Sequence, residues 1–227
     1  MAKVRTIEQL QLLLNEELAW RKSELAIILS LVNARSSSAE IVNCHIRSGI
    51  TLIYAHWEGF IKAAATAYLT YIASQRLTYS ELAHNFVAIA LKRLLNDARE
   101  SNKMTIYAQV VELFTSGLTD RCNLPTEIET KSNLSLEVLK EIISTLGLDY
   151  KAYKEEATFI DKTLLASRNS IAHGDYLLVG TEEFIKLHRT IINLMNLFSN
   201  QISNAASTKA YQRTSNNNLD QSFIDSH

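Results

Sequence analysis

The rarity of helix-breaking residues is the feature that most constrains the fold of this chain. Only one proline and six glycines occur among its 227 residues. Proline removes a backbone donor, and glycine supplies the unusual dihedral angles of tight turns. A β protein of this length needs many turns and therefore many more of both residues. The sequence favours long helices joined by few loops, and we predict an all-α bundle.

Capping signals and hydrophobic periodicity locate the individual helices. Capping boxes precede helical patterns at Thr6–Gln9, Ser37–Glu40 and Thr78–Glu81. Apolar residues then recur every three or four positions. Gly147 and Gly174 stand where the glycine after a helix end is expected. The predicted helices span residues 6–34, 38–74, 79–100, 104–116, 135–146, 152–173 and 181–203, and the longest loop spans 117–134.

The last part of the chain differs in composition from the rest. From about Ser203 the sequence becomes polar and loses its apolar period. Such segments cannot bury enough apolar surface to offset the entropy lost on ordering. We therefore predict a helical domain over residues 1–202 and a polar, flexible tail over residues 203–227.

Charge and cysteine content limit the classes of partner and compartment. The formal net charge is −1, so any contact with nucleic acid needs a local basic patch. Cys44 and Cys122 are far apart and form no metal-ligand pattern, as in a reduced cytoplasmic protein. The first residues lack the apolar core of a signal peptide, and no run is long enough to span a bilayer. We expect a cytoplasmic protein without a membrane partner.

Residues 164–176, LLASRNSIAHGDY, combine an apolar helical pattern with a polar one. Helical geometry places Ile160, Leu164 and Ile171 on one side. Four polar side chains lie along another arc of about 140°, namely Asp161, Arg168, Asn169 and His173. On this wheel Asn169 is near His173, and Arg168 is long enough to lean towards the imidazole. The segment is a candidate active site.

The residue types in this segment suit the cleavage of RNA. A ribose 2′-hydroxyl attacks its own phosphate if a base takes its proton and a donor stabilises the developing charge. His173 suits the first task because its ordinary pKa is near neutrality. Arg168 suits the second because its planar fork matches phosphate oxygens. Asn169 can fix the imidazole tautomer or donate to the phosphate. No metal or other cofactor is needed, and neither P-loop, HExxH nor GxGxxG occurs.

Two simpler interpretations compete with this one. Arg-x4-His spacing arises often by chance, and a histidine at a helix C-terminus is stabilised by the helix dipole. A second set of polar residues lies along the predicted helix 38–74, and it must face solvent, a partner or groups that satisfy its hydrogen bonds. This stripe consists of Arg47, Thr51, Tyr54, Glu58 and Lys62. His56 points to the opposite side and is expected to be a packing residue.

The segment SRNSIAHGDY resembles the signature of the HEPN superfamily, an Arg-x4–6-His motif with a polar residue after the arginine. The stretch RSGITLIYAHWEGFIKAAATAYLTYI is similar to the corresponding helix of a prokaryotic branch of HEPN-like nucleases. That branch is described from toxin–antitoxin and phage-defence loci. The resemblance covers roughly residues 5–200 and does not include the tail.

The resemblance implies an all-α, HEPN-like bundle that works as a homodimer and cleaves RNA without a metal. By position, Arg168 and His173 match the signature pair and Asn169 the polar residue. One histidine cannot serve at once as base and acid, and a twofold dimer supplies a second. An antitoxin protein is the further expected partner. The alternative is a non-catalytic HEPN module that binds RNA or acts as a scaffold in a defence complex.

The sequence also departs from part of the family. Some HEPN toxins carry a tyrosine two residues after the histidine, where a partner nucleotidyltransferase modifies it. Asp175 occupies that position here, and Tyr176 follows. The resemblance therefore does not extend to that modification. We predict a supporting or substrate-binding role for four residues: Asp161, Tyr176, Glu58 and Arg47.

Overall fold

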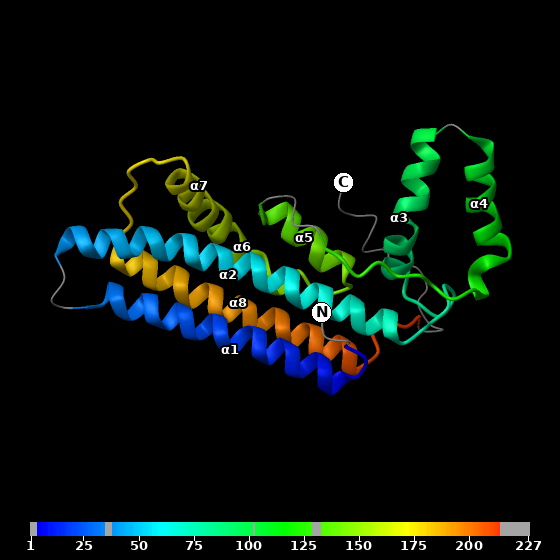
Figure 1. Ribbon diagram of the computed structural model, residues 1–227, viewed down its shortest axis with the longest axis horizontal. Coiled ribbons are helices and arrows are strands. Elements are labelled where there is room, and N and C mark those ends of the chain that lie inside the picture. Colours follow the sequence, from blue (N-terminus) through cyan, green and yellow to red (C-terminus); the bar gives the residue numbers. More distant parts are fainter. Residues whose placement is uncertain (1–3, 35–37, 102, 129–132, 214–227) are drawn as a thin grey trace.

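The fold was analysed on a computed structural model that describes residues 4–34, 38–101, 103–128 and 133–213. These residues contain no β-strand, which confirms the all-α prediction. A π-helical stretch, Ile160–Leu165, joins α6 to α7, and two 3-10 turns lie at Gly117–Thr119 and Lys151–Tyr153. The helices are α1 Ile7–Val32, α2 Ala39–Ser74, α3 His84–Ser101, α4 Met104–Thr115, α5 Leu136–Thr145, α6 Lys154–Phe159, α7 Ala166–Ala172 and α8 Thr181–Ser207 (Figure 1).

Local signals explain where the long helices begin and which face they bury. The Thr6–Gln9 capping box is formed, with the Thr6 hydroxyl accepting from the Gln9 amide at 3.3 Å. At the start of α2 the cap is Ser38, while the predicted cap Ser37 lies outside the described residues. The buried residues of α1 recur every three or four positions, as one stripe facing the core requires: Leu10, Leu14, Leu18, Arg21, Leu25, Ile28 and Val32.

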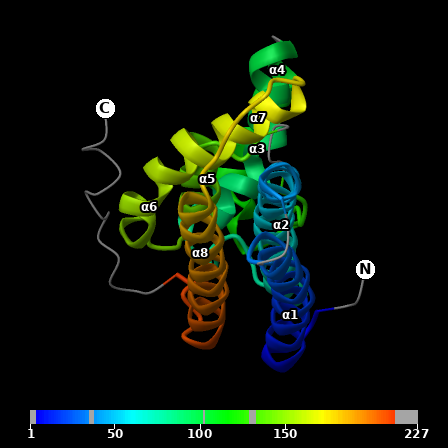
Figure 2. The same ribbon diagram turned by 90° about the vertical axis from the view of Figure 1, so that its left-hand side faces the viewer.

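The three longest helices form the body of the molecule. α1, α2 and α8 run side by side, and α5, α6 and α7 form a second layer that lies over α2 and α8 (Figures 1 and 2). The close approach of α2 to α8 depends on Gly49, because a Cβ there would lie 2.6 Å from the Phe184 ring. α2 is thus the central helix, with 16 buried residues along its length.

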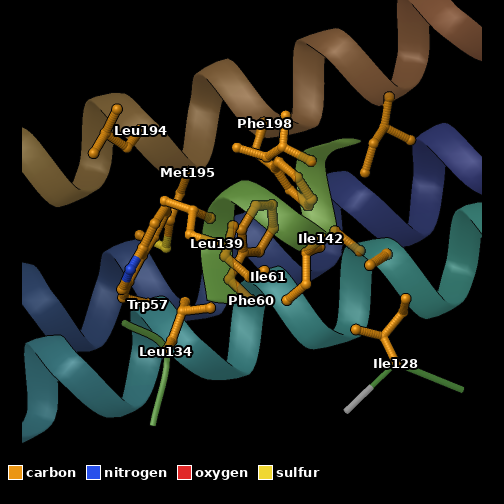
Figure 3. Close-up of a cluster of buried hydrophobic side chains, with 14 of the residues drawn as sticks. Trp57, Phe60, Ile61, Ile128, Leu134, Leu139, Ile142, Leu194, Met195 and Phe198 are labelled. Atoms are coloured by element: carbon orange, nitrogen blue, oxygen red, sulfur yellow. The ribbon is translucent and has the colours of Figure 1, made fainter. Parts of the chain in front are cut away.

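The core is continuous across α2. Trp57, Phe60 and Ile61 point from α2 towards both neighbouring layers in Figure 3. Phe60 meets Phe198 of α8 edge to face, with ring centroids 6.4 Å apart. On the side of α5 the same cluster contains Leu134, Leu139 and Ile142. Burial of this apolar surface fixes α2 relative to both layers, and with it the helix that carries the candidate site.

The start of α3 differs from the prediction. The Thr78–Glu81 motif forms, since the Glu81 carboxylate accepts from the Thr78 amide at 2.8 Å and from its hydroxyl at 2.9 Å. However, residues 79–83 are not helical, and α3 begins at His84. The amides of Tyr79 and Ser80 donate to carbonyls of residues 118–120 instead. The first amides of a helix have no partner within the helix. Here the amides of Tyr79 and Ser80 find acceptors in the distant loop, so a helix does not begin at these residues.

The helical domain also ends later than the sequence predicted. α8 continues to Ser207, and Tyr211 is buried with its ring 5.8 Å from that of Tyr71. The predicted boundary at residue 203 therefore falls inside a packed helix. Ala205, Ala206 and Tyr211 are buried although polar residues surround them in the sequence, and they pack the end of α8 against the core. The rest of the predicted tail, residues 214–227, lies outside the described residues.

The hairpin of α3 and α4 projects from one end of the bundle (Figure 1). No described residue of α4 is buried, although the helix is largely apolar. Its exposed large side chains are Met104, Tyr107, Val111 and Phe114. None of the helices in the described part of the chain is long and apolar enough to cross a membrane.

Candidate active site

The predicted helix 152–173 is present as α6, the π-helical stretch and α7 in succession. α7 ends at Ala172 with His173 as its C-cap, and Gly174 follows with a left-handed φ of +88°. The Gly174 amide donates to Ile171 at 3.1 Å, and the Asp175 amide donates to Ser170 at 3.1 Å. This pair of bonds is the Schellman arrangement that a glycine after a helix end allows. It fixes the direction in which the chain leaves the helix.

Arg168 is half-buried between α7, α2 and the loop before α5. Its Nη1 donates to the side-chain oxygens of Asn133 at 3.0 Å and Asn169 at 2.9 Å. The guanidinium carbon lies 4.6 Å from the centre of the Tyr54 ring, a cation–π distance. None of the described residues accepts a hydrogen bond from Nη2 or Nε. Among the described residues, Arg168 is therefore held through Nη1 alone, and its other donors have no acceptor there.

Tyr54 holds the loop that supports Arg168. Its hydroxyl accepts from the buried Leu134 amide at 2.8 Å, one residue after Asn133. Burial raises the pKa of the Tyr54 phenol above its usual range, and the neighbouring Glu58 carboxylate raises this pKa further. The phenol thus keeps its proton at neutral pH and accepts from the loop as a neutral group. Of the predicted polar stripe, Tyr54 thus lies next to Arg168, and Glu58 lies beside Tyr54.

Asp161 supports the same loop. Its Oδ1 accepts from the amide of Leu136, the first residue of α5, at 3.0 Å. A carboxylate at this position satisfies a free amide and complements the helix dipole. The sequence predicted that Asp161 shares the arc of Arg168 and His173. The intervening residues form a π-helix, whose wider turns alter the spacing around the axis, and the wheel assumed α-helical geometry throughout.

His173 is exposed at the end of α7. In the described part of the chain its imidazole has no hydrogen-bond or ion-pair partner. The expected approach of Arg168 to the imidazole is absent, because Arg168 leans back towards Tyr54. Side chains on a helix tilt towards its N-terminus, and five residues separate the two by about 7.5 Å along the axis. Asn169 is likewise engaged with Arg168. The two signature residues thus face different surroundings within one copy.

Arg47 and Tyr176 meet at the other end of the contact between α2 and α7. Nη1 of Arg47 donates to the carbonyl of Asp175 at 2.9 Å. Its guanidinium carbon lies 5.5 Å from the centre of the Tyr176 ring. The Asp175 carboxylate accepts from the Ser170 hydroxyl at 3.0 Å. The Tyr176 side chain remains 77% exposed, so its backbone is held while its ring faces solvent.

A groove of about 470 Å³ lies beside this pair. It is lined by Cys44, Arg47, Ser48, Thr51 and Ile171. α2 forms one wall and α7 the other, and the groove lies close to the end of α7 where His173 is exposed. In the part of the chain that the structure describes, no three His, Cys, Asp or Glu side chains gather as a metal site would require.

The remaining stripe residues and His56 complete the comparison with the sequence. Thr51 and Lys62 are exposed, so the stripe is buried only around Tyr54. His56 is buried on the opposite side of α2, edge to face with Trp20 at 5.1 Å. Burial lowers the pKa of His56, although the Glu24 carboxylate at 2.9 Å opposes this. His56 is a packing residue, as predicted.

The sequence did not predict the contact of Asn133 with Arg168, since no local pattern marks a loop residue that contacts position 168.

The fold and the site define an all-α domain in which an Arg-x4-His helix packs against a long central helix. The family model described as MAE_28990-like HEPN matches residues 10–211. The chain therefore belongs to the HEPN superfamily, which confirms the resemblance of its two segments. No curated protein and no solved structure matches the chain. Membership indicates a nuclease or RNA-binding role, since HEPN domains bind RNA, commonly have ribonuclease activity and often dimerise.

Proposed function

We propose that the protein is a metal-independent endoribonuclease. The observation that carries this proposal is the state of the signature pair: Arg168 is preorganised with unused donors, and His173 is exposed and unpartnered within the described residues. A preorganised guanidinium stabilises charge that develops in a transition state without further reorganisation. An accessible imidazole can reach a substrate hydroxyl. Both properties suit attack of a 2′-hydroxyl on the adjacent phosphate.

The proposed reaction needs two proton transfers and one displacement. His173 takes the proton of the 2′-hydroxyl, and the 2′-oxygen forms a bond to phosphorus. Arg168 stabilises the negative charge on the phosphorane oxygens. The bond to the 5′-oxygen then breaks, and that oxygen takes a proton from an acid. The products are a 2′,3′-cyclic phosphate and a 5′-hydroxyl, so no water is consumed in this step.

A homodimer would supply the acid. Each copy has one signature histidine, His173, and one histidine cannot serve at once as base and acid. A twofold arrangement that joins the ends of two α7 helices would bring the partner subunit's His173 to the site. Light scattering should give a dimer mass. Cys44 is exposed beside the groove and Cys122 is buried, so a short bis-maleimide should cross-link copies through Cys44. A strict monomer with full activity would contradict this arrangement.

Comparison of two exposed histidines tests the proposed activity. His173 is the C-cap of α7, whereas His84 begins α3 at the distant end of the bundle (Figure 1). Purified wild type and His84→Ala should cut a pool of cellular RNA at equal rates. His173→Ala should show no cleavage and should keep the melting temperature of His84→Ala within a few degrees. Equal activity of all three proteins would exclude His173 from catalysis.

We also propose that the protein acts as a toxin in a toxin–antitoxin or abortive-infection system, held in check by an antitoxin protein. The resemblance of the α2 and α7 segments to HEPN nucleases of such loci supports this role. Expression of the wild type should slow growth, and His173→Ala should relieve the effect at equal protein level. The alternative is a non-catalytic RNA-binding or scaffold module, in which Arg168 only ties the loop at Asn133 to α7. A growth defect that persists in His173→Ala would favour that alternative.

A further inference from the structure

The contact between Arg47 and Tyr176 combines exposure with rigidity. Three hydrogen bonds hold Asp175, the residue before Tyr176. Asp175 uses its amide, its carbonyl and its carboxylate in these bonds, to Ser170 twice and to Arg47 once. Arg47 also lies over the ring. The ring of Tyr176 is therefore presented to solvent in a fixed place, 77% exposed.

A fixed, exposed aromatic ring next to an arginine matches the chemistry of a single-stranded nucleotide. Bases of single strands stack on aromatic rings, and arginine binds the phosphate or stacks as a cation. The neighbouring groove adds the hydroxyl groups of Ser48 and Thr51 and an apolar wall at Ile171. In a duplex the same base faces are covered by their neighbours.

We propose that Tyr176 and Arg47 bind one unpaired nucleotide beside the cleavage site, with the base on the Tyr176 ring and its phosphate at Arg47. This inference rests on the proposed function, because it assumes that RNA is the ligand. It adds a nucleotide subsite: an unpaired nucleotide is bound at this pair of residues, and a base-paired one is not. The site lies at the end of α7, so the bound nucleotide flanks the phosphate at His173.

Binding of an RNA that cannot be cleaved tests the inference separately from catalysis. A 2′-O-methyl RNA hexamer has no free 2′-hydroxyl, so its affinity does not depend on nuclease activity. Wild type should bind the single strand at least about tenfold more tightly than the same hexamer in a duplex. Tyr176→Ala should weaken binding about tenfold, and Tyr176→Phe should recover most of it, because phenylalanine keeps the stacking face.

Leu178 provides the matched control, since it is 63% exposed two residues further along the same segment. Leu178→Ala should change the affinity less than twofold. The inference is overturned if Tyr176→Ala binds normally, if Leu178→Ala loses as much, or if the duplex binds equally well. A shift from dimer to monomer in sedimentation of Tyr176→Ala would also overturn it, since the ring would then contact a second copy. If binding depends on Tyr176 but no natural RNA is cut, the nucleotide site stands and the nuclease proposal fails.

Discussion

The contact between α2 and the helix α7 has a closed end and an open end, and each contains one arginine and one tyrosine. At the closed end, Arg168 of α7 lies over Tyr54 of α2. At the open end the elements are exchanged: Arg47 of α2 lies over Tyr176 after α7. Tyr54 is 3% exposed, whereas Tyr176 is 77% exposed. The same pair of residue types thus occurs in two different environments about 10 Å apart along α2.

The difference shows how burial changes what such a pair does. At the closed end the Tyr54 hydroxyl accepts from the Leu134 amide and Arg168 donates to Asn133, so the pair ties α2, α7 and the loop at Asn133 together. Around Tyr176 the backbone is held, but the ring itself faces solvent. Loss of a buried partner leaves polar groups unsatisfied, while loss of an exposed one is compensated by water. We therefore propose that the closed end orients Arg168 for the reaction and that the open end binds the flanking nucleotide.

Removal of each arginine should give the largest contrast. Arg168→Ala should reduce RNA cleavage by at least about 100-fold, because a donor to the developing charge is lost. It should also lower the free energy of unfolding by about 1–3 kcal/mol, since Asn133 and Asn169 lose their donor. Arg47→Ala should weaken RNA binding about tenfold and change stability by no more than about 0.5 kcal/mol. Urea unfolding and initial cleavage rates measure both effects.

A conservative variant separates the charge of Arg168 from its shape. Arg168→Lys keeps the charge but loses the planar fork, so cleavage should remain low. If Arg168→Lys were as active as wild type, the fork would have no part in the reaction. Equal loss of stability in Arg47→Ala and Arg168→Ala would remove the distinction between the two ends.

Deletion of one hydroxyl at each end sharpens the comparison. Tyr54→Phe keeps the ring beneath Arg168 but leaves the buried Leu134 amide without an acceptor, which should cost about 1–3 kcal/mol of unfolding free energy. Tyr176→Phe removes an exposed hydroxyl and should cost less than about 0.5 kcal/mol. Chemical denaturation of both variants at the same pH measures the two losses of unfolding free energy. Similar values for the two would mean that the loop at Leu134 does not depend on Tyr54.

The turn after α7 tests how the open end is held. Gly174 has φ of +88°, where a Cβ is unfavourable, so Gly174→Ala should cost about 1–2 kcal/mol. Gly174→Asn should cost less, because asparagine tolerates this region better. Binding of the 2′-O-methyl hexamer should fall with Gly174→Ala, since Asp175 and Tyr176 are displaced. Unchanged binding in a clearly destabilised Gly174→Ala protein would show that the turn does not position the ring.

Replacement of Asp161, before α7, and of Asp175, after it, should give the smallest difference in stability between the two ends. Asp161 satisfies the first amide of α5, so Asp161→Ala should cost about 1 kcal/mol. Asp175 accepts from an exposed Ser170 hydroxyl, and Asp175→Ala should cost no more than about 0.5 kcal/mol. Thermal melts of the two variants, side by side, measure the difference. A larger loss for Asp175→Ala would reverse the assignment of closed and open ends.

Most of the fold was accessible from the sequence because its signals are local. Capping residues, apolar periods and few breakers placed all the helices of the bundle, and the Arg-x4-His spacing drew attention to Arg168 and His173. The stripe along α2 included Tyr54 and Arg47 for the same reason. Local patterns failed where distant segments compete for a backbone donor, as at Tyr79 and Ser80.

The details of the site depended on contacts that no local pattern reports. Asn133 lies in a loop without periodicity, yet it sets the direction of Arg168. The π-helical turn between Asp161 and Arg168 changes their relative orientation, and the sequence carries no cap or breaker to mark it. The side chain of Arg168 therefore turns towards Tyr54 rather than towards His173. A helical wheel identifies neighbours on one helix, but it does not identify competing partners on another.

The chemical nature of the cut ends tests the central claim most directly. A synthetic RNA that wild type cleaves at one position is digested in EDTA, and the fragments are weighed by mass spectrometry. The account predicts a 2′,3′-cyclic phosphate and a 5′-hydroxyl, with no cleavage when that one nucleotide carries a 2′-deoxy sugar. Fragments with 5′-phosphate ends, or cleavage that survives the 2′-deoxy substitution, would contradict the account.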